Sequence, residues 1–299
     1  MSPPPIVAQG LGKRFRREWG LRGLTLEIPS GAIVGLAGPN GAGKSTFLAL
    51  ATGLLAPTEG TISVLGRDPL RSAGVLAKVG YVAQGAPLYR SFSVAETIEF
   101  ARRTNSGWED EAATDLLTRI DSKTKVGSLS EGDRARLALA LVLGKRPQLV
   151  LLDEPFASLD PLAGRELLQL LMDGVAETAA TVVVASHVVA DIERVCDHIV
   201  LLTAGGVRLE GNVEQLLDSH RLLTGPRRPL GSIRGVREIV RERHSGRQLT
   251  MLAVVDGPIV DPSWTVERVS LEELLLAYMA PERLPTSRPP EKVPLRWHG

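Results

Sequence analysis

GPNGAGKST, residues 38–46, follows an apolar, strand-like run and precedes the apolar segment FLALATGLL. Glycines let the backbone curl with its N–H groups around an anion, and a helix starting near Lys44 would direct its positive end at the same anion. Lys44 is expected to reach the β- and γ-phosphates of a nucleotide, and Ser45 to offer its hydroxyl to Mg²⁺. A glycine-rich turn before a helix is the structural alternative. The pattern predicts a nucleoside triphosphate site lined by Gly38, Pro39, Asn40, Gly41, Ala42, Gly43, Lys44, Ser45 and Thr46.

Composition and charge narrow the class of protein. The 299 residues carry a formal net charge of +1, so there is no global basic field of the kind that marks a nucleic-acid binder. The single cysteine, Cys196, excludes an internal disulfide and is expected to be a small buried hydrophobe. The N-terminus lacks the pattern of a secretory signal, and the apolar runs fall short of the roughly 20 residues that span a bilayer. We therefore expect a cytoplasmic protein, with any membrane span supplied by another subunit.

Apolar periodicity and turn residues predict an α/β fold. The expected order is β-structure over 5–37, a helix to about 55, strands before 84, helices over 94–120 and 129–145, and alternating strands and helices over 148–211. Pro147 should end the second of those helical stretches. Such alternation is what a mostly parallel sheet with flanking helices requires.

The composition changes after about residue 218. RLLTGPRRPLGS, residues 221–232, is rich in Arg, Gly and Pro and is typical of a linker. A β-hairpin around the turn at 244–246 and a short amphipathic helix over 270–279 then predict a small accessory α+β domain, residues 219–280. The proline-rich, charged tail, 281–299, is expected to be disordered.

A second chemical signal is LVLLDEP, residues 149–155, a buried-type strand that ends in two carboxylates. Buried strands do not carry charge without a partner. Asp153 is expected to hold Mg²⁺, and Glu154 to lie beside the γ-phosphate and polarise the attacking water. Solvated acids at a strand edge are the alternative for this motif alone.

Four further segments follow in a fixed order: Gln84 after the strand VGYVA, LSEGD at 129–133, Ser-Leu-Asp at 158–160, and His187 after TVVVAS. Taken singly, Gln84 is a polar residue after a strand and His187 a structural histidine. Together with the phosphate loop and the acidic strand, residues 5–218 resemble the ATP-binding subunit of an ABC transporter.

The resemblance implies a role for each segment. Gln84 would sense Mg²⁺ and the attacking water and face the membrane subunit, and His187 would contact the γ-phosphate. Ser130 and Gly132 would hold the γ-phosphate of ATP bound to the opposite subunit. Asp160, with its two preceding residues, would link the two sites.

The resemblance also implies the fold and the assembly. It implies a P-loop NTPase (RecA-like) domain over 1–218, with an N-terminal antiparallel β-subdomain and a helical insert at about 91–146. It further implies an ATPase that uses ATP and Mg²⁺, pairs with itself or a similar chain, and drives a separately encoded membrane-spanning permease. The chain would be peripheral at the inner face of the membrane, with no nucleic-acid partner. The resemblance associates an interval as short as 85–128 with exporter-type systems, and so it implies export.

The residue that stacks on adenine is less well defined. Phe15 occupies the place where related proteins carry an aromatic side chain, and Trp19 is a rival. Base stacking on an aromatic ring contributes about 1–3 kcal/mol. A core role for Phe15 is the alternative.

The segment LSEGD departs from the family pattern, which has glycine in place of Glu131 and glutamine in place of Asp133. Acids in a first helical turn suit the helix dipole, which is one explanation. The other is that they weaken the nucleotide sandwich, since a charge pair at about 8 Å and a dielectric of about 40 repels by on the order of 1 kcal/mol.

Two other functions stay open at this point. One is a soluble ABC-type ATPase that acts on DNA or ribosomes, although only one ATPase unit and no long heptad segment is present. Its one supporting feature is the Arg-rich stretch 234–247, where Glu238 and Glu242 favour a solvated hairpin face. The other is a catalytically silent subunit, which the retained lysine, carboxylates and histidine argue against.

Overall fold

The computed structural model describes residues 3–176, 178–227, 233–246 and 248–280. Its largest sheet has the strand order β5 (Val79–Val82), β6 (Leu149–Asp153), β7 (Thr181–Ser186), β3 (Ile33–Ala37), β8 (His198–Thr203) and β9 (Gly206–Asn212). The first five strands are parallel, and β9 runs antiparallel to β8. Because the parallel strands share one direction, the residues after their carboxyl ends gather at one edge. The mostly parallel sheet predicted from the sequence is confirmed.

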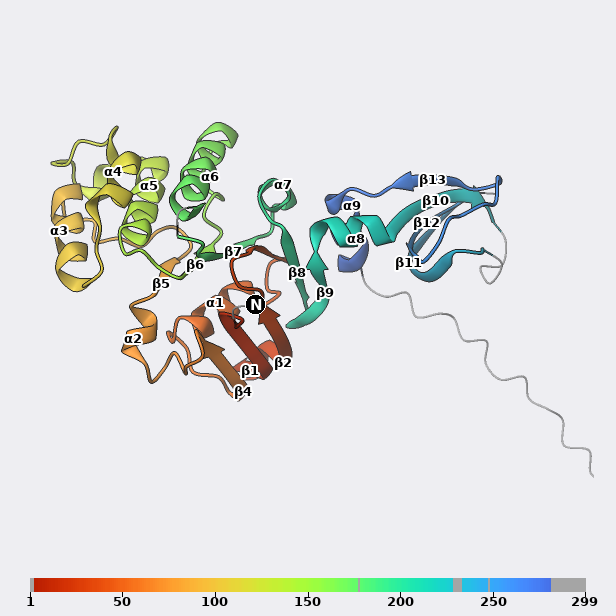
Figure 1. Ribbon diagram of the computed structural model, residues 1–299, viewed down its shortest axis with the longest axis horizontal. Helices are drawn as coiled ribbons and strands as arrows, with labels where there is room; N and C mark the ends of the chain where they lie inside the picture. The colour runs from red at the N-terminus through yellow and green to blue at the C-terminus, as the bar shows by residue number, and fades with distance from the viewer. Residues whose placement is uncertain (1–2, 177, 228–232, 247, 281–299) are drawn as a thin grey trace, which may run out of the picture.

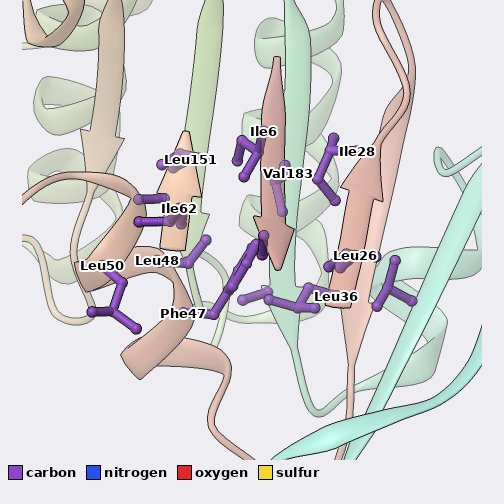
Figure 2. Close-up of a cluster of buried hydrophobic side chains, with 14 of the residues drawn as sticks. Ile6, Leu26, Ile28, Leu36, Phe47, Leu48, Leu50, Ile62, Leu151 and Val183 are labelled. Carbon is purple, nitrogen blue, oxygen red and sulfur yellow. The ribbon is translucent and has the colours of Figure 1, made fainter. Parts of the chain in front are cut away.

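A smaller antiparallel sheet lies against α1 (Lys44–Ala51), with the order β2 (Glu18–Ile28), β1 (Ile6–Phe15) and β4 (Glu59–Val64). Figure 2 shows buried side chains from this sheet, from α1 and from the parallel sheet in one cluster: Ile6, Leu26, Ile28, Leu36, Phe47, Leu48, Leu50, Ile62, Leu151 and Val183. Phe47 is fully buried, so its truncation to alanine would cost about 3–5 kcal/mol. This packing holds α1 against both sheets.

Helix α1 is shorter than predicted, since it ends at Ala51 rather than near residue 55. The hydroxyl and the N–H of Thr52 both donate to Leu48 O, at 2.9 Å. Gly53 then adopts a φ of +69°. A glycine in the left-handed conformation after the last turn is a common helix stop, which the apolar run that continues to Leu55 conceals in the sequence.

The chain segment that connects β5 to β6 forms a mostly helical region at one side of the sheet (Figure 1). It contains α3 (Val94–Thr104), α4 (Asp110–Leu117), the 3₁₀ turn η1 (Val126–Ser128) and α5 (Glu131–Leu143). The stretch 94–120, predicted as helical, is therefore two helices. The break comes at Asn105, whose side chain donates to Ala101 O at 2.8 Å. Helix α5 ends ahead of Pro147, as predicted.

The remaining elements of this part of the chain are α2 (Ala73–Leu76), α6 (Pro161–Ala176), α7 (Val189–Glu193) and α8 (Val213–Ser219). Helix α6 packs beside α5 through buried Leu167, Leu168 and Leu171. Helix α7 lies over β3, where a Cβ at Gly35 would come within 2.2 Å of Ile192. Glycine at this position therefore permits the close approach of α7 to the sheet.

The C-terminal part forms a separate antiparallel sheet (Figure 1), in the order β11 (Val236–Ser245), β12 (Gln248–Val255), β10 (His220–Pro226) and β13 (Thr265–Arg268), with α9 (Leu271–Met279). The predicted linker is wrong over 221–226, because these residues form β10, an inner strand. Gly225 is required for packing rather than for flexibility, since a Cβ there would lie 2.6 Å from the Trp264 ring. Residues 228–232 of the predicted linker, and the predicted disordered tail, lie outside the described residues.

The two parts share a hydrophobic core. Leu271, Leu274 and Leu275 of α9 pack with Ile192 and Cys196. Cys196 is buried, which raises the pKa of its thiol to about 12, with a smaller effect of the Asp197 charge in the same direction. It is the buried hydrophobe predicted. Across the described ranges, no helix has both the length and the apolar character to cross a membrane.

Candidate nucleotide site

The carboxyl edge of the parallel sheet gathers most of the predicted site residues. The phosphate loop, 38–43, follows β3, and Asp153 ends β6 with Glu154 next to it. His187 follows β7, the neighbour of both strands, and Gln84 follows β5 at the sheet's edge. The strand order, rather than closeness in sequence, therefore brings these residues to one edge.

Glycines give the phosphate loop its shape. Gly38 and Gly43 have φ values of +151° and +101°. A Cβ at Gly38 would come within 2.4 Å of Leu202 O, and one at Gly43 within 2.5 Å of Gly20 O. Gly41, with a φ of +81°, faces open space. Helix α1 begins immediately after the loop without a side-chain cap and without an acid in its first turn, so its first N–H groups are available to an anion.

Lys44 lies folded inside the loop. Its Nζ donates to Gly38 O at 2.7 Å and to Pro39 O at 3.4 Å, and lies 3.5 Å from Glu154 Oε1. The side chains of Lys44 and Glu154 are 6% and 7% exposed, so this is a buried ion pair. A buried cation needs compensating acceptors, which phosphate oxygens could replace.

Glu154 is held from several sides. Its backbone has a φ of +49°, which is unusual for a residue other than glycine. Its N–H donates to Ala185 O at 2.9 Å, and its Oε2 lies 2.8 Å from Nδ1 of His187. His187 is 44% exposed. The pair joins a buried carboxylate to an imidazole that solvent can reach, which suits proton transfer to or from a bound reactant.

Ser45 and Asp153 form the pair predicted to hold Mg²⁺. Ser45 donates its hydroxyl to Asp153 Oδ1 at 3.0 Å. Burial raises the pKa of Asp153, an effect that the hydrogen bond from Ser45 opposes. These hard oxygen donors fit Mg²⁺, which usually takes one or two protein ligands plus phosphate and water. Within the described ranges no group of three or more His, Cys, Asp or Glu side chains is arranged to hold a metal.

Phe15 and Trp19 lie in different surroundings. A Cβ at Gly20 would lie 2.9 Å from the Phe15 ring and 3.2 Å from Thr46 Oγ1, so Phe15 stands next to the start of α1. Trp19 packs near Gly12 instead, where a Cβ would lie 3.1 Å from its ring. Phe15 is 45% exposed, which is not the burial expected of a core residue.

The segment LSEGD lies on a different element. Ser130 caps α5, and its Oγ accepts from Asp133 N–H at 3.1 Å and donates to Asp133 Oδ2 at 2.6 Å. Gly132 faces Leu159, and a Cβ there would lie 3.9 Å away. Throughout the described residues, no hydrogen bond or ion pair joins 129–133 to the phosphate loop.

Asp160 acts here as a helix cap. Its Oδ1 accepts from the N–H groups of Leu162 and Ala163, at 3.0 and 3.1 Å, at the start of α6. Ser158 and Leu159, just before Asp160, border a cavity of about 70 Å³, which is lined in addition by neighbours of Gln84, the start of α5 and Glu154. The cavity places the surroundings of Gln84, Glu154 and LSEGD next to one another.

Two ionisable residues near the site did not stand out in the sequence. Asp191 on α7 is half-buried and hydrogen-bonds to Ser186; burial raises its pKa, the neighbouring Arg194 opposes the shift, and the charge of Glu154 adds to it. Burial, with a contribution from Asp153, raises the pKa of Tyr81 to about 12. The only sequence signal for Asp191 is its position one helical turn after His187.

A phosphate loop between β3 and α1, a buried lysine, and two carboxylates at the end of β6, which β7 separates from β3, define a P-loop ATPase. Residues 21–157 match the family model described as ABC transporter. The chain is 34% identical over 226 residues to the Nod factor export ATP-binding protein I of Rhizobium johnstonii, covering 73% of this chain and 72% of the relative. It is 31% identical to the methionine import ATP-binding protein of Protochlamydia amoebophila, covering 66% and 62%.

A solved structure, a dimeric post-hydrolysis state of an ATP-binding cassette bound to ADP and Pi, superposes with a TM-score of 0.63 at 26% identity. The superposition covers 70% of this chain and 98% of that one. The chain belongs to the family of ABC transporter ATP-binding subunits. It binds and hydrolyses ATP.

Proposed function

We propose that two such subunits close around ATP, so that each nucleotide is held by the phosphate loop of one chain and the LSEGD segment of the other. The observation that carries this proposal is the separation of the two halves. Lys44, Glu154 and His187 are linked at one sheet edge, and Ser45 bonds to Asp153 at the same edge, whereas Ser130 bonds to none of these residues. A site with only the first half can bind ATP but leaves the outer side of the γ-phosphate open.

In the proposed cycle, Lys44 exchanges its carbonyl and Glu154 contacts for phosphate oxygens. Glu154 then becomes free to orient a water molecule for attack, and His187 holds the γ-phosphate side. Bound at Ser45 and Asp153, Mg²⁺ would neutralise phosphate charge. Gln84 is exposed, and its neighbours Ala83 and Gly85 line the cavity that Glu154 also borders, so Gln84 can approach the metal side when the subunits close.

An exposed aromatic cluster supports a membrane partner. Tyr89 and Phe100 are 66% and 51% exposed, and the centres of their rings lie 6.4 Å apart. The ring centre of Phe92 lies 5.3 Å from that of Tyr89 and 6.4 Å from that of Phe100. Large exposed apolar patches mark interaction sites. We assign this surface, close in sequence to Gln84, to contact with a separate membrane-spanning permease. The chain would then work at the inner face of the membrane, in export, with Nod factor export among the functions of its relatives.

We also propose the domain division 1–218, with a helical insert at about 91–146, and an accessory domain at 219–280. The support is that β10–β13 form their own sheet with a second core around Trp264 and Met251.

The test uses Glu154→Gln, with Glu193→Gln as the matched control because Glu193 is an exposed acid of α7. Hydrolysis should fall by about 10²–10⁴-fold in Glu154→Gln, the usual contribution of a general base. ATP, but not ADP, should then shift this variant from monomer to dimer in sedimentation velocity, while Glu193→Gln behaves like the parent. A Glu154→Gln protein that stays monomeric at saturating ATP would contradict the shared site.

A further inference from the structure

We propose that Asp133 is a positioning residue that holds the hydroxyl of Ser130 away from the partner subunit's ATP, so that closure requires this bond to break. The inference rests on the proposed function, in which Ser130 contacts the γ-phosphate. Its basis is the pair of bonds between these two residues. Ser130 Oγ accepts from the Asp133 N–H at 3.1 Å and donates its proton to Asp133 Oδ2 at 2.6 Å.

A serine hydroxyl has one proton to donate, and phosphate oxygens at neutral pH mainly accept. The Asp133 carboxylate and the γ-phosphate therefore compete for the same proton. Hydrogen bonds to an ionised carboxylate are shorter and about twice as strong as neutral ones, and 2.6 Å lies in that short range. The chain thus carries a built-in competitor for its own phosphate contact, which an amide at position 133 would weaken.

Glu131 separates this effect from simple repulsion. It has the same charge, stands immediately after Ser130 in the same helical turn, and is exposed. In the part of the chain that the structure describes, the Ser130 hydroxyl is bonded to Asp133 and not to Glu131. If negative charge alone weakened closure of the dimer, Glu131 and Asp133 would both weaken it. If the hydrogen bond from the Ser130 hydroxyl weakens closure, only Asp133 should have this effect.

The experiment measures the ATP concentration for half-maximal dimerisation in the full chain carrying Glu154→Gln. Adding Asp133→Asn should lower that concentration about tenfold, whereas adding Glu131→Gln should change it less than threefold. The N–H of residue 133 still donates to Ser130, so both proteins should keep the melting temperature of the parent within a few degrees. Equal effects of the two substitutions would overturn the inference.

A double-mutant cycle tests whether Asp133 acts through the hydroxyl. With Ser130→Ala as the starting point, Asp133→Asn should no longer lower the ATP requirement. A persisting tenfold effect would overturn the inference. With Glu154 intact, Asp133→Asn should lower KM for ATP hydrolysis more than it changes kcat, a split that a merely structural role would not produce. A Glu154→Gln parent that never dimerises overturns the proposed function and this inference together, whereas a dimer insensitive to Asp133→Asn overturns only the inference.

Discussion

Helices α1 and α5 begin in opposite ways, although both are proposed to meet the same nucleotide in the assembled dimer. Helix α1 starts after Gly43 with no side-chain cap and no acid in its first turn. Helix α5 starts with Ser130 as its cap and with Glu131 and Asp133 in its first turn. Each helix start carries unsatisfied N–H groups and a partial positive charge.

The two helix starts differ in how ready they are to bind an anion. At α1 no side chain caps the first N–H groups, and the Lys44 ammonium donates to the carbonyl oxygens of Gly38 and Pro39. Phosphate oxygens can replace these carbonyl oxygens as acceptors. At α5 a serine hydroxyl and two carboxylates already satisfy and offset the positive helix end. ATP is thus expected to bind first at α1, and α5 to contribute only on closure.

The largest effect is expected for Lys44→Ala. Each charge-assisted hydrogen bond contributes about 1.5–3 kcal/mol, so loss of the ammonium should weaken ATP binding to the monomer by about 100-fold or more. Isothermal titration of ATP into the monomer measures this. Lys145→Ala is the matched control, because Lys145 is half-buried and, like Lys44, donates to two backbone carbonyls, Leu76 O and Val79 O, both at 2.8 Å and away from the site. Similar losses of affinity in both variants would contradict the role of α1.

Phe15→Ala should have the next largest effect. Its ring stands beside Gly20 and Thr46, at the α1 end. Loss of about 1–3 kcal/mol of stacking should weaken binding of ATP to the monomer by about 5- to 150-fold. Trp19→Ala should leave the affinity unchanged, and the same titration compares the two. A stronger effect of Trp19→Ala would contradict this prediction and would indicate that adenine stacks on Trp19 rather than on Phe15.

A smaller effect, confined to closure, is expected for Ser130→Ala. The loss of a helix cap costs about 1 kcal/mol of the free energy of unfolding. The monomer should bind ATP as the parent does, while dimerisation in the Glu154→Gln background should need several-fold more ATP. Ser270→Ala removes the equivalent cap of α9, which also accepts from the residue three positions on, and should cost stability without touching dimerisation. Equal dimerisation in both variants would show that Ser130 only caps its helix.

The smallest effect is a shift in the pH dependence of Mg²⁺ binding at Ser45 and Asp153, beside the start of α1. Burial raises the pKa of Asp153, so this carboxyl takes up its proton at a higher pH than an ordinary aspartate. Binding of Mg²⁺ needs the ionised form, and it should be complete above the folded-state pKa and lost as pH falls through it. The Mg²⁺ concentration for half-maximal ATPase activity should therefore rise on mild acidification before the protein unfolds, as followed by circular dichroism. A requirement for Mg²⁺ that stays constant until unfolding would contradict this.

Local patterns predicted much of the fold and the α1 half of the site. The glycine loop, the acidic strand end and the alternation of strands and helices depend on residues close in sequence, and the parallel sheet follows from them. The linker prediction failed at 221–226, because Arg, Gly and Pro there serve strand β10 and its contact with Trp264. Composition reports local flexibility but not the long-range packing that overrides it.

The order of residues along the chain was enough to predict the chemistry of the site, because a phosphate loop, a lysine, two carboxylates and a histidine follow one another at the ends of strands that pair in a parallel sheet. The tertiary structure decided which groups are paired. Lys44 with Glu154, Glu154 with His187, and Phe15 rather than Trp19 beside α1 are consequences of strand order and packing between distant segments. The bond from Ser130 to Asp133 spans a single helical turn. The sequence nevertheless leaves open whether Glu131 and Asp133 merely suit the helix dipole or accept a hydrogen bond from the Ser130 hydroxyl. Only side-chain geometry, with one proton to donate and a carboxylate 2.6 Å away, distinguishes the two.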